Sequence, residues 1–164
     1  MLKKTKTRII LCLCLLALNL CFIWGNSLLP GEISGALSDF VKDILKGFLE
    51  LLFGPRLDGP SGGGGLLRKL AHFTEFTCLG LCLSWLFGML RTKPIEHILF
   101  PLFAGFTAAC IDETIQIFVP LRGPAIKDVG IDTAGVVLGI VFIALFQLIK
   151  KTKSNKTNLE ENKL

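Results

Sequence analysis

The stretch ILFPLFAGFTAACIDETIQIFV, residues 98–119, decides the fold class of this chain. It is apolar along most of its length, and about 20 such residues span the hydrocarbon core of a bilayer. Its charged and amide side chains, Asp112, Glu113 and Gln116, stand only in the second half. The stretch therefore predicts a transmembrane helix whose polar residues gather near one end.

Three further stretches share this length and character: residues 9–29, 70–90 and 129–149. With 51% hydrophobic residues among 164, the chain is too apolar for a soluble domain. The first stretch is too long for a cleaved signal peptide and lacks the small-residue cleavage site, so we expect an uncleaved helix. Because an open sheet leaves backbone groups unpaired in lipid, we predict one all-α integral membrane domain, residues 1–164, with four transmembrane helices.

The pattern changes between the first two spans. In residues 33–53 apolar side chains recur every three or four positions and charges fill the other face, which predicts an amphipathic helix. Its regular charges argue against spanning, so we expect it to lie in the interface on the outer side. Residues 54–65 contain prolines and four consecutive glycines and predict a flexible linker. No Gly-Lys-Ser or Gly-Lys-Thr follows, so we expect no phosphate-binding loop.

Lysine and arginine gather in the short flanks of the predicted spans. The N-terminal arm, the turn at residues 91–93 and the tail at residues 150–164 are basic, and four spans put all three on one side. The positive-inside rule then predicts a multi-pass membrane protein with both termini in the cytoplasm. The net charge of +5 comes largely from the two ends of the chain. No basic stripe carries interleaved aromatics, so we expect no nucleic-acid partner.

The six cysteines all lie in apolar stretches, where they behave as small hydrophobic residues. They complete no zinc pattern with histidine, and a lone histidine among carboxylates is a weak metal signature. From the sequence we therefore assign no metal site, and we name no cofactor.

Ionisable residues inside the spans lie near one end of them, on the predicted outer side. Neighbours three or four positions apart share a helix face, so three helices can turn polar edges to a common centre. Such residues are functional-site candidates in a membrane protein, although a network that only fixes helix packing has the same pattern. The residues concerned are His72 and Glu75, then Asp112, Glu113 and Gln116, then Asp128 and Asp132.

These carboxylates would repel one another unless cations lie among them. The candidate cations are Arg68, Lys69, Arg122, Lys127, a protonated His72 or a bound metal. Arg122 has two possible roles: it compensates Asp128 or Asp132, or it holds a ligand phosphate as a bidentate donor.

Two sequence blocks together resemble the VanZ-like family. They are RKLAHFTEF at residues 68–76 and, more specific, IDETIQIFVPLRGPAIKDVGID at residues 111–132. The resemblance implies a bacterial membrane protein of four or five helices, whose name-giving member is associated with reduced susceptibility to teicoplanin; it implies no known reaction. It departs at Leu121, where the family often has glycine, which bears on the aim of Arg122. The matching positions are Lys69, His72, Asp112, Glu113, Gln116, Arg122, Asp128 and Asp132.

Two functional hypotheses follow, and whether the protein is an enzyme stays open. In the first, the outer pocket binds teicoplanin-type lipoglycopeptide or a lipid-linked wall precursor, with membrane lipids around it. In the second, the protein is a membrane-embedded hydrolase acting on a phosphate- or carboxylate-bearing envelope lipid. A scaffold without ligand is the third reading. The ligand-binding candidates are Lys69, Gln116, Arg122, Asp128 and Asp132; the catalytic candidates are His72, Glu75, Asp112 and Glu113.

Overall fold

The computed structural model describes residues 2–34, 36, 39–40, 43, 63–90, 93, 95–123 and 125–161. In these ranges the long elements are helices: α1 (Leu2–Ser27), α3 (Gly63–Met89), α4 (Glu96–Ile117) and α5 (Ile126–Glu161). Each contains a stretch long and apolar enough to cross a membrane: Thr5–Ser27, Arg68–Met89, Glu96–Ile117 and Ile126–Lys153. The predicted all-α fold with four membrane-spanning helices is confirmed.

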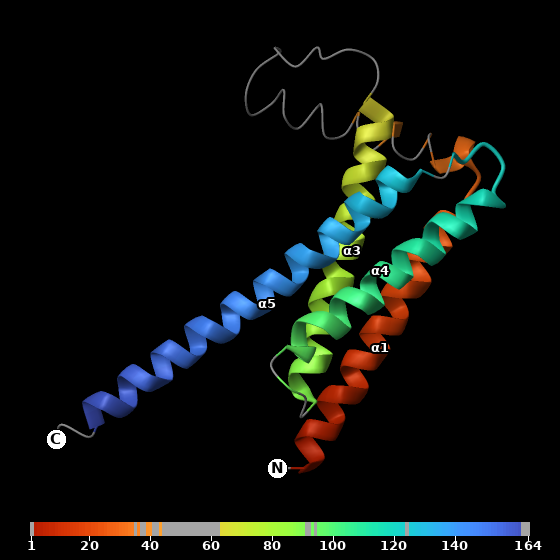
Figure 1. Cartoon of the computed structure of the whole chain (residues 1–164). Helices are drawn as coiled ribbons and strands as arrows, with labels where there is room; N and C mark the ends of the chain where they lie inside the picture. Colours follow the sequence, from red (N-terminus) through yellow and green to blue (C-terminus); the bar gives the residue numbers. More distant parts are fainter. Residues whose placement is uncertain are drawn as a thin grey trace, which may run out of the picture.

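The helices alternate in direction, so the described chain ends lie away from the turn that joins α4 to α5 (Figure 1). The described residues of that turn are 118–123 and 125. We call the region around it the polar end; it comprises residues 26–31, 68–75, 112–125 and 128–132. All the predicted site residues belong to this end of the bundle.

Three helix boundaries differ from the sequence prediction. Helix α1 begins at Leu2, before the predicted span 9–29. Helix α3 begins at Gly63, inside the predicted linker 54–65. Helix α5 continues to Glu161, through the predicted tail, because residues 150–161 contain no proline or glycine to stop it. Of the predicted amphipathic helix 33–53, the described residues 33, 34, 36, 39, 40 and 43 are helical. The rest of that helix, and most of the linker, lie outside the described residues.

Helices α3 and α5 approach closely through glycines. A Cβ added to Gly135 would lie 2.5 Å from the carbonyl oxygen of Phe73, and one added to Gly139 would lie 2.6 Å from the backbone nitrogen of Leu81. Without a hydrophobic driving force between helices in lipid, such small residues let backbones pack against each other. The small-residue step from Gly135 to Gly139 therefore accounts for the close packing of α5 against α3.

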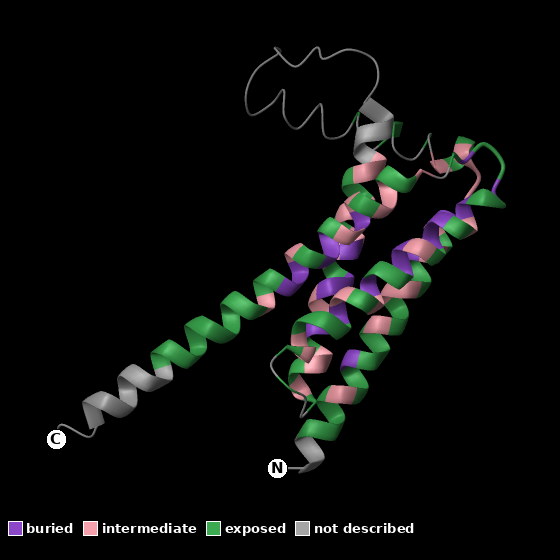
Figure 2. Cartoon of the chain, viewed as in Figure 1, coloured by how far each residue is buried: buried purple, intermediate pink, exposed green. Residues whose placement is uncertain are grey.

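The buried apolar side chains lie where the helices face one another (Figure 2). They form one cluster: Ile23, Phe76, Leu79, Leu83, Ala108, Ala109, Val136 and Ile140. Residues 144–153 of α5 are all exposed, in the part of the helix that diverges from the bundle (Figure 2). The first half of α5, which carries two of the predicted carboxylates, is therefore the half packed into the fold.

Candidate functional site

The polar end buries charged and amide side chains of α4 and α5. Asp112 and Gln116 of α4 are 0% and 2% exposed, and Asp132 of α5 is 1% exposed. Buried polar groups are costly unless they are paired. Which atoms have partners therefore separates structural contacts from candidate functional groups.

Gln116 and Glu113 form a network within α4 and to its neighbours. The Gln116 amide nitrogen donates to Asp112 Oδ2 at 2.9 Å, to Glu113 Oε1 at 3.2 Å and to Ser27 Oγ at 3.4 Å. The second Glu113 oxygen accepts from the Ala125 backbone N–H at 2.9 Å, just before α5 begins. Glu113 thus ties the end of α4 to the start of α5 and has both carboxylate oxygens paired.

Asp128 is compensated by a lysine. Its Oδ1 lies 3.1 Å from Lys69 Nζ, with side chains 16% and 42% exposed, and its place in the first turn of α5 suits the helix dipole. We considered Arg122 as the cation for Asp128 or Asp132. At Asp128 the structure gives that role to Lys69.

Arg122 instead docks on the end of α1. Its Nη2 donates to the Asn26 carbonyl oxygen at 2.7 Å and its Nε donates to the Leu29 carbonyl oxygen at 3.2 Å. These are carbonyls that a helix end leaves without an intrahelical partner. Burial, and then the nearby Arg68, lower the pKa of Arg122, but a guanidinium still stays charged. Its Nη1 is buried and has no hydrogen-bond partner.

The turn that aims Arg122 passes through Leu121, the position at which the resemblance to the VanZ-like family leads us to expect glycine. Leu121 has φ 59°, in the left-handed region that glycine enters freely and that costs other residues about 1–2 kcal/mol. The Gly31 backbone N–H donates to the Pro120 carbonyl oxygen at 3.2 Å, which holds the turn against the chain after α1. The turn therefore forms with leucine in place, at some cost in strain.

A cavity of about 80 Å³ lies beside Arg122, and we call it the arginine pocket. Glu75 Oε1 accepts from Asn26 Nδ2 at 2.8 Å, while Glu75 Oε2 is buried without a partner. The pocket thus offers an unpartnered donor on Arg122 and an unpartnered acceptor on Glu75. Its lining is Asn26, Leu29, Ser34, Arg68, Ala71, His72, Glu75 and Arg122.

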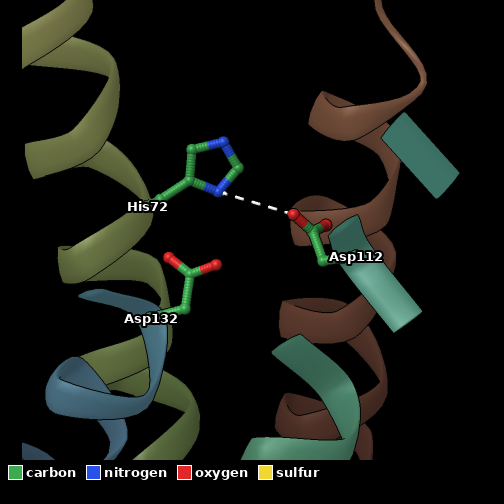
Figure 3. A group of neighbouring side chains, drawn as sticks. All are labelled: His72, Asp112 and Asp132. Atoms are coloured by element: carbon green, nitrogen blue, oxygen red, sulfur yellow. Dashed lines mark ion pairs between the residues drawn. The ribbon is translucent and has the colours of Figure 1, made fainter. Parts of the chain in front are cut away.

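His72, Asp112 and Asp132 face one another in a second group (Figure 3). His72 Nδ1 lies 3.7 Å from Asp112 Oδ2, and one nitrogen or oxygen atom from each of the three residues lies within 4.8 Å of the others. We call these three residues the His-Asp-Asp cluster. Among the described residues it is the group whose donor types and spacing fit a metal ion.

Three threonines of the helices that carry these groups turn their hydroxyls to their own backbones. Thr74 donates to the Leu70 carbonyl oxygen, and Thr114 and Thr133 donate likewise to the carbonyls four residues before them, each at 2.7 Å. A hydroxyl nucleophile needs a base within hydrogen-bond reach. The hydrogen bonds of these three threonines include no such base.

The sequence correctly predicted which three helices contribute residues to the site, but the prediction left out the contribution of α1. The predicted residues do lie together: Lys69, His72, Glu113, Gln116, Asp128 and Asp132 line one small cavity, and Glu75 and Arg122 line the neighbouring arginine pocket, which shares His72 with it. The sequence prediction overlooked Asn26 and Ser27 of α1. A signal was present, because these two polar residues end the first apolar stretch at the same membrane depth as the others.

A family model described as VanZ/LLP1 matches residues 9–147. The match includes every residue of the three groups described above. No curated protein and no solved structure matches the chain.

Proposed function

Because the chain belongs to the VanZ/LLP1 family, we propose that this membrane protein binds an anionic envelope ligand in the arginine pocket. The ligand is teicoplanin-type lipoglycopeptide or a lipid-linked wall precursor, and its capture lowers susceptibility to the antibiotic. The observation that carries the proposal is the buried, unpartnered Nη1 of Arg122 beside a cavity of about 80 Å³.

The charge and shape of the pocket favour an anion. Arg68 and Arg122 both line it, and a guanidinium matches carboxylate or phosphate through paired N–H donors. A buried donor left unpaired costs about 1–3 kcal/mol, and an anionic oxygen at this place would remove that cost. Backbone carbonyls already hold the other two Arg122 nitrogens, so the free N–H is fixed in direction before the ligand arrives.

The opposite wall narrows the ligand class. Glu75 Oε2 is buried and unpartnered, so it favours a hydroxyl, amide N–H or ammonium next to the anionic group. Phosphates joined to a sugar, as in lipid-linked wall precursors, and a peptide carboxylate beside an amide or amine, as in glycopeptides, both meet this description. A simple phosphate ion meets only half of it.

The alternative, a membrane hydrolase using His72, Glu75, Asp112 and Glu113, stays a prediction. Glu113 is engaged through both oxygens, which leaves it poorly placed as an acid or base. The contacts of the described threonines favour none of them as the nucleophile. Binding therefore has the stronger support.

Ligand binding is tested by thermal unfolding of the purified protein in mild detergent, with and without teicoplanin or a short polyprenyl diphosphate. A ligand at 100 times its Kd stabilises by about 2.7 kcal/mol, which a melting curve resolves. We expect Arg68→Gln and Arg122→Gln to remove this stabilisation. The matched control is Lys127→Gln, an exposed cation at the same end of the bundle, which should keep it.

The two arginine variants should differ in their melting temperature without ligand. Arg122→Gln also removes the bonds to the end of α1, so it should melt lower without ligand, and Arg68→Gln carries the test. If Arg68→Gln responds to both ligands as fully as the wild type does, the arginine pocket is not the binding site.

The proposed orientation has its own test. In a cysteine-free background, a cysteine at Gly123, which is exposed and has no atom within 4 Å of its added Cβ, should react with a membrane-impermeant maleimide in intact bacteria. A cysteine at Ser154 should react only after lysis, since the basic flanks favour a cytoplasmic tail. The reverse labelling pattern would move the pocket to the cytoplasmic face and exclude capture of an external antibiotic.

A further inference from the structure

The His-Asp-Asp cluster combines two buried carboxyl groups with a half-buried imidazole, and several of their polar atoms lack hydrogen-bond partners. Asp132 is 1% exposed with neither carboxylate oxygen bonded, Asp112 is 0% exposed with Oδ1 unbonded, and His72 Nδ1 is buried without a hydrogen bond. Buried polar atoms normally have partners. Here the three side chains come from three different helices and face one another (Figure 3). The Asp112 oxygen nearer His72 is Oδ2, which also accepts from the Gln116 amide.

The charges around the His-Asp-Asp cluster are also unbalanced. The small cavity at this place has a volume of about 10 Å³, room for about one water-sized sphere. Its lining includes three carboxylates, those of Glu113, Asp128 and Asp132, with the cations of Arg68 and Lys69. Lys69 is paired with Asp128, so the two inner carboxylates, Asp112 and Asp132, are left with little fixed positive charge for two negative groups.

We propose that the His-Asp-Asp cluster binds one divalent transition-metal ion through His72 Nδ1 and one oxygen each of Asp112 and Asp132. This goes beyond the proposed ligand binding, because it concerns a neighbouring group of residues and needs no antibiotic or lipid. An imidazole nitrogen with carboxylates suits zinc, iron or manganese, whereas magnesium and calcium favour all-oxygen sites. Zn²⁺ is the probe of choice, because it binds more tightly than Mn²⁺ to a given set of such ligands.

The distances between the ligand atoms of the cluster are close to those around a bound zinc ion. Ligand atoms about 2.1 Å from a zinc ion lie roughly 3.4 Å apart in a tetrahedron, and His72 Nδ1 to Asp112 Oδ2 is 3.7 Å. The widest separation within the group, up to 4.8 Å, closes with side-chain shifts of about 1 Å. Three protein ligands leave a fourth position for water or substrate, as in catalytic zinc sites.

The open position would lie near the arginine pocket. His72 and Arg68 line both the small cavity and the arginine pocket, so the two spaces are neighbours. A metal ion here would offer a second positive contact to an anionic group held by Arg122.

The test measures metal on the full-length protein in mild detergent, without any antibiotic or lipid probe. After chelator treatment and dialysis, Zn²⁺ is added back, and bound metal is counted by mass spectrometry and titrated by calorimetry. We expect about one zinc per chain. His72→Ala and Asp132→Asn should each weaken Zn²⁺ binding by at least about 10–100-fold, since even outer-shell partners of a metal contribute that much.

His97→Ala is the matched control, because His97 is the other histidine of the chain and begins α4 at the opposite end of the bundle. It should keep full binding. Melting curves of both variants check that they are folded. If His72→Ala does not fold, the comparison of the wild type with Asp132→Asn decides the test.

Two results would overturn the proposal: no zinc retained by the wild type, or equal zinc in the wild type and in Asp132→Asn. Either one leaves the arginine pocket intact, since that pocket is tested separately by Arg68→Gln with teicoplanin and the polyprenyl diphosphate.

Discussion

The polar end has two sides that both contain buried carboxyl groups. On one side their oxygens have hydrogen-bond partners, and on the other side they do not. On the paired side, Glu113 is 7% exposed and both of its oxygens accept hydrogen bonds. On the unpaired side, Asp132 is 1% exposed and neither of its oxygens does. Burial alone therefore does not mark a functional residue in this bundle. The partners do: a carboxylate satisfied within the protein holds helices together, and one left unsatisfied is free to bind something else.

The largest expected effect on stability comes from a substitution on the paired side. Glutamine at position 113 has one acceptor oxygen and an amide, so Glu113→Gln cannot accept from both Ala125 N–H and the Gln116 amide. We expect a loss of about 1–3 kcal/mol of unfolding free energy, the cost of a buried group left unpaired. Thermal unfolding in detergent measures it.

Lys69→Gln provides the scale for that measurement. Because Lys69 is 42% exposed, loss of its ion pair should cost less than about 1 kcal/mol. If Glu113→Gln costs no more than Lys69→Gln, the tie between α4 and α5 is not holding the bundle.

A smaller effect of opposite sign is expected on the unpaired side. With metal removed by chelator, Asp132→Asn takes away a buried negative charge that has no partner in the structure, so the variant should be as stable as the wild type or more stable by up to about 1 kcal/mol. The measurement is the same unfolding experiment in the presence of chelator. A loss comparable to that of Glu113→Gln would show that Asp132 is held by contacts within the protein, and the distinction between the two sides would fail.

Glu113→Gln and Asp132→Asn serve as controls for each other, because both are isosteric carboxylate-to-amide changes at buried positions. Any general sensitivity of the bundle to such a change appears in both. Only the difference between them reports on pairing.

Much of the fold could be predicted from the sequence, because length and apolarity are properties of local stretches. A run of about 20 apolar residues has few options in lipid, and the structure has a helix for each of the four. The Gly135–Gly139 step is likewise local, and the close helix contact that the structure forms there needs small residues. Helix ends were less predictable: α5 continues to Glu161 because nothing in its charged tail stops a helix.

The sequence by itself determined which residues could meet. Helical spacing puts His72 and Glu75 on one face of α3, and Asp112 and Gln116 on one face of α4, and the depth of these residues in their spans brings them to one end. Only the tertiary structure decided which of them pair. Lys69, not Arg122, reaches Asp128, and Arg122 turns to the end of α1 through a leucine in a left-handed conformation. Pairing depends on distances of about 3 Å between atoms of different helices, which are set by how α3 and α5 pack through their glycines and by the turn at residues 118–125, and no spacing within one helix encodes them.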